Sequence, residues 1–443
     1  MIEPSGYGSW GRVFNPRQRV ARMRDRTERL PLPDDGGTIL PYGAGRSYGD
    51  SCLNDGGTVL RTRDLDRFIA FDPATATLRC EAGVLLAEIA AFALPRGLFL
   101  PVTPGTRFVT VGGAIANDVH GKNHHRAGTF GHHVPRFELL RSDGSRLECS
   151  AGANAELFRA TIGGLGLTGL ITWAEIRLMR VAGPWVRQVE RRFGSLAEFF
   201  ALSEPLEQQH EYVVAWLDCL PRDNGATRGV LFAGDHDASP APVRERTARA
   251  VPLTPPFSLV NNLTLRAFNE LYFRTHGREG DAKAVPWDTF FYPLDGLRGW
   301  NRMYGPRGFF QYQCVVPEGD RGRAALEALL AGIAASGQGS FLGVLKRFGA
   351  HPGAGMLSFP RPGYTLALDF PNRGEATAQL LDALDLIVLE AGGRVYAAKD
   401  ARMSARAFRA FYPEWQAFAR FVDPRFSSSF WRRVTAGAAE ASA

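Results

Sequence analysis

A run of closely spaced glycines near the N-terminus constrains this chain more than any other feature. Gly43, Gly45 and Gly49 follow a short apolar run, Ile39 to Pro41, that is typical of a β-strand. Glycine permits positive φ angles and lets several backbone N–H groups approach one point, which is what binding a pyrophosphate requires. The sequence therefore predicts a dinucleotide-binding loop at the end of a strand.

The spacing of these glycines, GxGxxxG, differs from the GxGxxG of a Rossmann turn. A literal GxGxxG does occur at Gly164, Gly166 and Gly169, but it follows a helix-like stretch (156–162) and precedes a strand-like one (170–178). A Rossmann turn needs the opposite order, a strand and then a helix. We interpret this second glycine run as a tight turn close to the cofactor, in a fold that is not a Rossmann domain.

The 443 residues are too many for one core and indicate two or three domains. Up to about residue 180, short strand-like runs alternate with turns and a few helices, which indicates an α+β fold rather than a regular βαβ sheet. The strand-like runs are 58–60, 76–81, 137–140 and 170–178. A helix is expected over 85–94, ended by Pro95, and a hairpin turn at Asp143.

The pattern of expected strands and helices changes after about residue 185. Strands are expected at 190–192 and 212–217, and the proline-rich stretch 239–256 is expected to be mobile. Helices are expected over 326–335 and 376–390, the second ended by Gly392 and Gly393. The last fifty residues begin with a strand-like run, Arg394 to Asp400, and end in an aromatic-rich helical tail.

Charge and cysteine content limit the functional classes. The formal net charge of +7 favours an acidic partner, a phosphate ester, an anionic membrane or a nucleic acid, although an arginine-rich surface alone would give the same value. No nucleic-acid-binding module accompanies these charges. The five cysteines are scattered without CxxC spacing, which argues for a reducing compartment and against a structural zinc site. His124, His125, His132 and His133 do not follow metal-ligand spacing, so no metal is expected.

The first residues contain an acid and a proline where a signal peptide would have basic and then apolar residues. No apolar run approaches the roughly 18 residues of a membrane-spanning helix. The expected location is the cytoplasm, or the inner face of the plasma membrane as a peripheral protein. Six arginines interleaved with apolar residues suggest such a membrane contact, although a solvated loop region is the alternative. These residues are Arg244, Arg246, Arg249, Arg266, Arg274 and Arg278, with Phe257, Leu259, Leu263, Phe268 and Phe273.

A set of motifs in a fixed order resembles the FAD-linked oxidases of the vanillyl-alcohol-oxidase (PCMH) type, and among them most closely the branch that oxidises decaprenylphosphoryl-β-D-ribose at C2. The resemblance extends over most of the chain, and the order of the motifs makes it specific. The motifs are the glycine loop, Pro104-Gly-Thr-Arg107, Val111-Gly-Gly-Ala114, His120-Gly-Lys-Asn-His-His125, Phe291-Tyr-Pro-Leu-Asp295, Trp300-Asn-Arg-Met-Tyr-Gly-Pro306, Gln311-Tyr-Gln313, Leu345-Lys-Arg-Phe-Gly349, Leu357-Ser-Phe-Pro360 and Tyr396-Ala-Ala-Lys-Asp400.

The resemblance implies a split FAD-binding domain. Its N-terminal part would be 1–184 and its C-terminal segment 394–443, with a substrate (cap) domain built on an antiparallel sheet inserted at 185–393. The positions matching FAD contacts are Pro41, Tyr42, Gly43, Ala44, Gly45, Arg46, Ser47, Tyr48, Gly49, Asp50, Ser51, Gly105, Thr110, Val111, Gly112, Gly113, Asn117, Asp118, Val119, His120, Ile171 and Tyr396. Tyr48 stands where relatives with a covalently bound flavin have histidine, so the FAD here is expected to be non-covalent.

The resemblance also implies the residues that act on the substrate. The two catalytic candidates that it gives are Lys399, which matches a flavin-contacting lysine needed for activity, and Tyr292, which matches a position in the substrate pocket. His120, in a glycine-flanked loop, is our candidate for proton handling. The remaining substrate candidates are Lys122, Trp216, Gln311, Gln313, Lys346, Thr365 and Ala367. Lys346 suits a phosphate, and Trp216 is either a sugar-stacking wall or ordinary core.

Two of these positions depart from the family pattern. Ala367 replaces the cysteine that nitroaromatic inhibitors modify covalently in mycobacterial relatives, and Thr365 replaces an asparagine. The expected activity is oxidation of the ribose C2 hydroxyl of a polyprenyl-phosphate-linked ribose to the 2-keto sugar, in the synthesis of cell-wall arabinan. A NAD(P)H-dependent short-chain reductase would complete the epimerisation, and a quinone or another acceptor would reoxidise the flavin. The alternatives are an FAD oxidase of a soluble polyol, aldonolactone or nucleotide sugar, and a non-catalytic flavoprotein.

Overall fold

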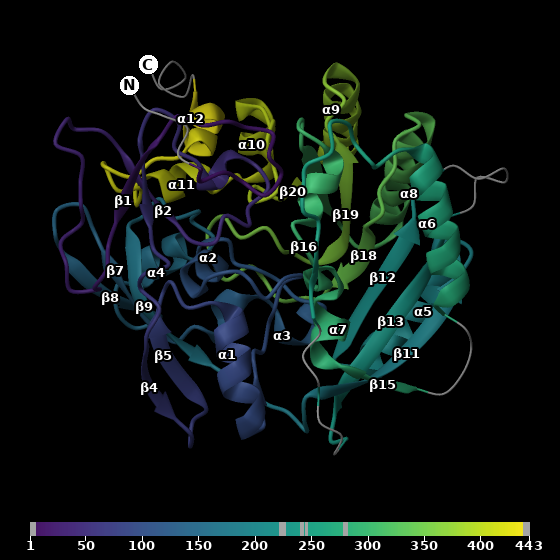
Figure 1. The fold of residues 1–443 in the computed structure, drawn as a ribbon, viewed down its shortest axis with the longest axis horizontal. Coiled ribbons are helices and arrows are strands. Elements are labelled where there is room, and N and C mark those ends of the chain that lie inside the picture. Colours follow the sequence, from purple (N-terminus) through teal and green to yellow (C-terminus); the bar gives the residue numbers. More distant parts are fainter. Residues whose placement is uncertain (1–5, 221–226, 240–242, 244–246, 278–281, 437–443) are drawn as a thin grey trace.

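The computed structural model describes residues 6–220, 227–239, 243, 247–277 and 282–436. Two small sheets and the C-terminal helices form one half of the molecule, and a large sheet with its helices forms the other (Figure 1). The coarse α+β expectation is confirmed, because helices and mostly antiparallel strands are mixed without a βαβ repeat.

The glycine loop follows a strand of a three-stranded parallel sheet. Its order is β1–β3–β2, with β1 at Arg19–Arg22, β2 at Ile39–Tyr42 and β3 at Thr58–Arg61. The C-terminal segment packs back on this sheet: the Ile39 carbonyl accepts from the Ser427 N–H, and Arg433 pairs with Asp50 at 2.7 Å. The first and last parts of the chain therefore lie side by side, purple beside yellow in Figure 1.

A five-stranded antiparallel sheet has the order β4–β5–β9–β7–β8. Its strands are β4 (Phe68–Asp72), β5 (Thr77–Glu81), β9 (Leu170–Arg177), β7 (Arg136–Leu140) and β8 (Arg146–Ser150). The helices around it are α1 (Leu86–Ala93), α2 (Val111–Ala116), α3 (His124–Ala127) and α4 (Ala155–Thr161), and short strands β6 (Leu98–Phe99) and β10 (Met179–Arg180) pair beside it. The expected strands and helices of this region are confirmed, and the run 164–169 is a turn from α4 into β9 with Gly166 at φ +75°.

The largest sheet has eight strands, all antiparallel, in the order β15–β11–β13–β12–β18–β19–β17–β20. The strands are β15 (Lys283–Pro286), β11 (Trp185–Phe193), β13 (Arg228–Asp237), β12 (Tyr212–Asp218), β18 (Gly343–Phe348), β19 (Gly363–Pro371), β17 (Phe309–Val316) and β20 (Arg394–Val395). The helices packed on one face are α5 (Leu196–Gln209), α8 (Asp320–Ala335) and α9 (Glu375–Glu390).

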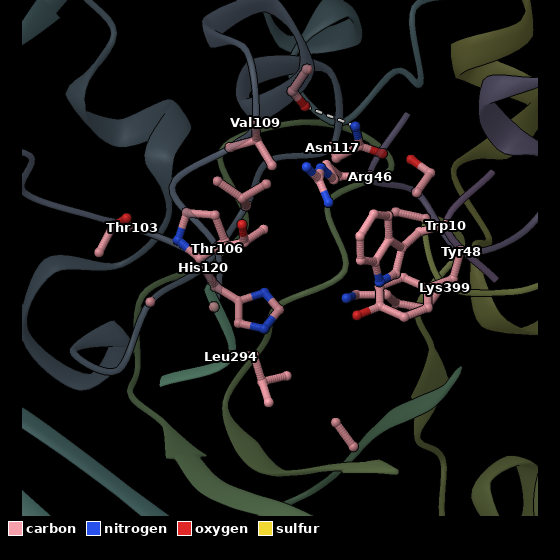
Figure 2. A pocket seen from close by; sticks show the side chains of 18 of the residues that line it. Trp10, Arg46, Tyr48, Thr103, Thr106, Val109, Asn117, His120, Leu294 and Lys399 are labelled. Atoms are coloured by element: carbon pink, nitrogen blue, oxygen red, sulfur yellow. Dashed lines mark hydrogen bonds between the residues drawn. The ribbon is translucent and has the colours of Figure 1, made fainter. Parts of the chain in front are cut away.

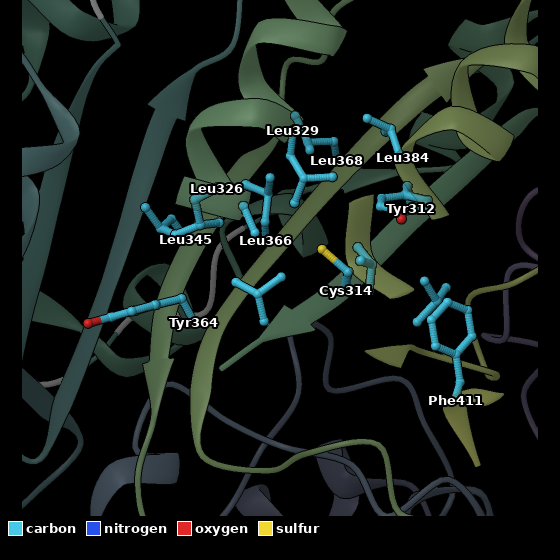
Figure 3. Close-up of a cluster of buried hydrophobic side chains, with 14 of the residues drawn as sticks. Tyr312, Cys314, Leu326, Leu329, Leu345, Tyr364, Leu366, Leu368, Leu384 and Phe411 are labelled. Carbon is cyan, nitrogen blue, oxygen red and sulfur yellow. The ribbon is translucent and has the colours of Figure 1, made fainter. Parts of the chain in front are cut away.

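Side chains of this sheet alternate between that helix-covered core and the opposite face. Tyr312 and Cys314 of β17, with Leu366 and Leu368 of β19, point into the apolar core (Figure 3). Because strand side chains have a period of two, the residues between them point to the other face. That second face carries the polar residues Gln311, Gln313, Thr365 and Asp369.

The remaining elements connect these layers. They are α6 (Asn262–Thr275), α7 (Trp287–Phe291), the paired strands β14 (Arg249–Ala250) and β16 (Leu297–Arg298), the C-terminal helices α10 (Ala405–Phe411), α11 (Trp415–Ala419) and α12 (Ser429–Thr435), and short 3₁₀ turns at 50–52, 94–96, 130–133, 293–296 and 300–304. The expected strand from Arg394 to Asp400 was too long. Only Arg394 and Val395 pair with β17, and the Lys399 N–H then donates to the Tyr396 carbonyl in a turn.

Candidate active site

A cavity of about 720 Å³ lies where the glycine loop, the loops around α2 and the polar face of the large sheet meet. Arg46, Tyr48, His120 and Lys399 surround the same open space (Figure 2). Most of the predicted cofactor positions line this cavity. Five of the predicted positions do not line it: Tyr42, Gly49, Asp50, Val111 and Asp118.

The loop after β2 has the properties of an anion cradle. Within the described residues, none of the backbone N–H groups of residues 43–47 donates to a protein acceptor. Gly45 has φ +61°, and a Cβ there would overlap the Tyr42 hydroxyl. Free N–H groups lining a cavity suit a pyrophosphate. The residues present therefore fit the phosphates of a dinucleotide.

The other two glycines of the motif serve close packing rather than positive φ. A Cβ on Gly43 would overlap the Thr110 hydroxyl, which caps α2 by accepting from the Gly113 N–H. A Cβ on Gly49 would overlap the carbonyl oxygen of Asp400. Gly49 thus allows the C-terminal segment that carries Lys399 to approach the loop, which the sequence did not indicate.

The C-terminal segment brings two predicted residues to the cavity. The Tyr396 hydroxyl donates to the Asn117 carbonyl at 2.7 Å, joining this segment to the end of α2. Lys399 points its ammonium at the Tyr48 ring, 4.0 Å from the ring centroid. Burial lowers the pKa of Lys399, and the carboxylate of Asp369 opposes that shift.

Asp369 is a residue that sequence reasoning missed. It is fully buried, its Oδ1 accepts from Gln311 Nε2 at 2.6 Å, and burial raises its pKa. It lies on β19 two and four residues beyond Ala367 and Thr365, on the same face of the strand. That period-two spacing is the feature by which the sequence could have revealed it.

His120 is held by the sheet rather than by its own loop. Gln313 Nε2 lies 2.9 Å from His120 Nε2 and 3.2 Å from the Thr365 hydroxyl oxygen, so these three residues form one buried group. The His120 Nδ1 has no partner among the described residues. Burial, together with Lys346, His124 and Lys399, places the pKa of His120 well below its usual value. The imidazole is therefore neutral at neutral pH.

Two further lysines are enclosed on the same side of the cavity. Lys122 donates to the Phe290 carbonyl, and Lys346 Nζ donates to the Gly121 carbonyl at 3.1 Å. Within the described part of the chain, neither ammonium forms an ion pair with a carboxylate. Burial lowers the pKa of each to about 7, and the charge of Lys122 contributes to the shift of Lys346. Uncompensated cations facing a cavity are suited to an anionic ligand.

The other substrate candidates either line the cavity or contact a residue that lines it. Gln311, Gln313 and Ala367 line the cavity, as does Trp216, whose Nε1 donates to the Phe341 carbonyl at 2.9 Å. Thr365 does not line it and acts on Gln313 instead.

Tyr292 does not reach the cavity either. It is 1% exposed, and its hydroxyl is hydrogen-bonded to that of Thr103, which is a lining residue. The four histidines 124, 125, 132 and 133 also lie outside the lining, and no group of His, Cys, Asp or Glu among the described residues is arranged to hold a metal ion.

Comparisons with known proteins agree with this site. A protein-family profile for an FAD binding domain matches residues 32–150, which include the glycine loop and α2. The chain is 39% identical to decaprenylphosphoryl-β-D-ribose oxidase of Mycolicibacterium smegmatis, over 96% of each chain. It is 35% identical to an uncharacterized protein of Streptomyces coelicolor, over 79% of this chain and 100% of that one. Cytokinin dehydrogenase 8 of rice is 31% identical over 41% of this chain and 36% of its own length.

The near full-length match to the mycobacterial protein and the FAD-binding profile together settle the family. The chain is an FAD-dependent oxidoreductase, and it belongs to the decaprenylphosphoryl-β-D-ribose oxidase family of vanillyl-alcohol-oxidase-type FAD-linked oxidases.

Proposed function

We propose that this protein oxidises the C2 hydroxyl of a polyprenyl-phosphate-linked ribose to the 2-keto sugar. The observation that carries the proposal is the pair of lysines, Lys122 and Lys346, enclosed in the flavin cavity without a carboxylate partner. Keeping two like charges together in a site of low dielectric is costly, and an anionic group between them offsets that cost. A substrate phosphodiester has the required charge. A neutral polyol or lactone does not.

We assign the chain to the three parts expected from the resemblance, residues 1–184, 185–393 and 394–443. Strand β11 of the large sheet begins at Trp185, and β20, its last strand along the chain, is Arg394–Val395. The chain then turns directly toward the glycine loop, where Gly49 meets Asp400. In this division the large sheet covers the flavin with its polar face, and the helices α5, α8 and α9 lie on its far side.

Bound FAD supplies the acceptor for a hydride from the carbinol carbon. The chain must then take up the hydroxyl proton and place positive charge where the reduced flavin becomes negative. His120 is the proposed proton acceptor, at the unpartnered Nδ1. This role requires the His120 proton to be on Nε2. The Gln313 Nε2 faces both His120 Nε2 and the Thr365 hydroxyl in the structure, so the amide must turn over for its carbonyl to accept from Nε2–H. Burial lowers the pKa of His120 most and the charge of Lys346 lowers it further, so a phosphate beside Lys346 weakens that second effect.

Lys399 is the proposed stabiliser of the reduced flavin, and Tyr48 positions its ammonium by a cation–π contact. Because tyrosine offers no imidazole to the flavin, the FAD is held without a covalent bond. Tyr292 acts through Thr103 as a positioning residue. A NAD(P)H-dependent reductase would convert the keto sugar to the arabinose form, and a quinone or another acceptor would take the electrons.

The test compares a substrate that carries a phosphate with one that does not. A short-chain prenyl-phosphoryl ribose and an alkyl riboside of equal length are turned over by the wild type and by Lys346→Met and Lys122→Met, with Leu386→Met on the exposed side of α9 as the control. The proposal expects the wild type to prefer the phosphorylated substrate and each lysine variant to lose that preference. Equal use of both substrates by the wild type would reject it.

A further inference from the structure

Exposed apolar side chains are concentrated in one stretch of the chain. Among the described residues, six of the ten exposed large hydrophobic side chains lie between residues 253 and 271. They are Leu253 (77% exposed), Phe257 (66%), Leu259, Leu263 (78%), Phe268 and Leu271 (63%). Single exposed leucines are ordinary, but a concentration of this kind marks an interaction site. We call these six residues the 253–271 surface.

The surface is held in place by the rest of the molecule. Asn261 caps α6 by accepting from the Leu263 and Thr264 N–H groups at 3.1 Å. The Leu259 N–H donates to the Met303 carbonyl at 2.8 Å. Leu265, one helix face away from Leu263, is fully buried. The apolar side chains are therefore presented outward by anchored backbone, and α6 lies at the outer edge of the molecule (Figure 1).

The charge around this surface is positive. Arg249, Arg266, Arg298 and Arg302 are all exposed near it. Strand β14 pairs with β16, and the Arg302 guanidinium donates to the Val251 and Pro252 carbonyls, which places the last two arginines beside the loop. The acid Glu270 is neutralised by Arg228 at 2.8 Å and Arg274 at 2.6 Å. Of the expected basic stretch, Arg244, Arg246 and Arg278 lie outside the described residues, and Phe273 packs under Arg228 rather than outward.

The surface is continuous with the wall of the cavity. Trp300 and Leu294 line the cavity and share one apolar cluster with Val260 and Leu265, whose neighbours Leu259 and Leu263 are exposed. Tyr272, on the inner side of α6, lines the cavity as well. One helix thus has its inner face on the substrate cavity and its outer face on the apolar patch.

We propose that the 253–271 surface docks on an anionic lipid bilayer, so that a lipid-linked substrate reaches the cavity from the membrane. This inference rests on the proposed function, because only a lipid-linked substrate gives the protein a reason to dock. Vesicle binding is measured independently of turnover. Apolar side chains interleaved with arginines match the acyl boundary and the anionic headgroups of a bilayer. A second copy fits less well, because a two-fold interface would bring the same arginines against one another.

The flavin-loaded protein is sedimented with vesicles of equal parts phosphatidylcholine and phosphatidylglycerol, and with vesicles of phosphatidylcholine alone. Wild type is expected to bind the anionic vesicles, with an affinity that falls as salt rises. Leu263→Glu combined with Leu271→Glu is expected to weaken binding about tenfold or more, because burying charged side chains in the bilayer is costly. Leu386→Glu, which places the same charge on the exposed side of α9, is expected to bind like the wild type.

Should the double variant lose its flavin, Arg266→Glu alone and Phe257→Ser alone serve in its place, with weaker vesicle binding expected of each. Equal binding by wild type and variants overturns the proposal. So does an absence of vesicle binding in a wild type that sediments as a dimer and becomes monomeric on Leu263→Glu.

Turnover separates the docking proposal from the proposed function. The docking variants should keep wild-type activity on a short-chain, water-soluble prenyl-phosphoryl ribose and lose activity on a long-chain substrate held in vesicles. Vesicle binding without short-chain turnover would reject the proposed function and leave the docking surface standing.

Discussion

The ammonium nitrogen of Lys399 lies 4.0 Å from the centroid of the Tyr48 ring, where the C-terminal segment meets the glycine loop. The two residues come from opposite ends of the chain, and the close approach of Gly49 to Asp400 brings them together. A tyrosine paired with a lysine leaves no histidine at this point of the loop.

Acid precipitation of the purified yellow protein should leave the flavin in the supernatant, because Tyr48 cannot form the histidyl bond. The measurement is the absorbance of supernatant and pellet after precipitation. Colour retained by a washed pellet would show a covalent flavin and contradict this assignment.

Replacing Lys399 by methionine should slow flavin reduction by about 100-fold or more, because a positive charge near the reduced flavin is lost. Rapid mixing under anaerobic conditions measures this rate, and Lys399→Arg, which keeps the charge, should recover part of it. The midpoint potential of the flavin in Lys399→Met should also fall. An unchanged potential would assign the lysine to packing alone.

The lysines Lys122 and Lys346 should give substrate binding a pH dependence. Each has a pKa of about 7, so the cationic form that binds phosphate is lost as the pH rises above that value. KM for a phosphorylated substrate should therefore rise above about pH 7 to 8, and Lys346→Met should raise it about 10- to 100-fold at pH 6.5. A KM that is flat with pH, or equal in Lys346→Met, would contradict the phosphate site.

The same two groups should affect folding stability in the ligand-free protein. Their folded pKa values lie below the roughly 10.4 of an unfolded lysine, so between about pH 7 and pH 10 the unfolded chain binds more protons. These lysines therefore penalise folding fully below about pH 7, and the penalty is relieved as the pH rises. Thermal melts of wild type, Lys122→Met and Lys346→Met should show the variants more stable at pH 6, with the difference shrinking toward pH 9.

Ala367 should protect this protein from nitroaromatic inhibitors that modify a cysteine in relatives. It lines the cavity and lies opposite Gln313 in the sheet. Wild type should regain full activity after such an inhibitor is removed by dialysis, whereas Ala367→Cys should be inactivated irreversibly and gain the mass of the adduct. Irreversible loss in the wild type would show another target.

The glycine loop, the helices α8 and α9 and most strands followed from local patterns, because glycine spacing and apolar periodicity act over a few residues. The roles of individual glycines did not follow. Gly49 is required by a carbonyl oxygen 351 residues away in the chain, at Asp400, and such contacts have no local pattern. The expected strand beyond Val395 is wrong, because the run 397–400 consists of residues with low strand propensity and the Lys399 N–H finds its acceptor within the segment.

The candidate site followed mainly from the family resemblance, and the structure added how its members act on one another. Gln313 lies within hydrogen-bond distance of His120 and Thr365. Asp369 accepts a hydrogen bond from Gln311, and its charge raises the pKa of Lys399 against the effect of burial. The period of two along β19 relates Thr365, Ala367 and Asp369, yet only the pairing of β17 with β19 shows what they face. Tyr292 could not be placed behind Thr103 from sequence, since that contact joins distant segments.

In the part of the chain that the structure describes, every helix is too short or too polar to span a bilayer.

Anaerobic mixing of the flavin-loaded protein with prenyl-phosphoryl ribose tests the central claim most directly. The flavin absorbance in the blue should bleach within the mixing experiment, and ribose without the prenyl phosphate should leave it unchanged. Bleaching by the free sugar but not by prenyl-phosphoryl ribose would contradict the account.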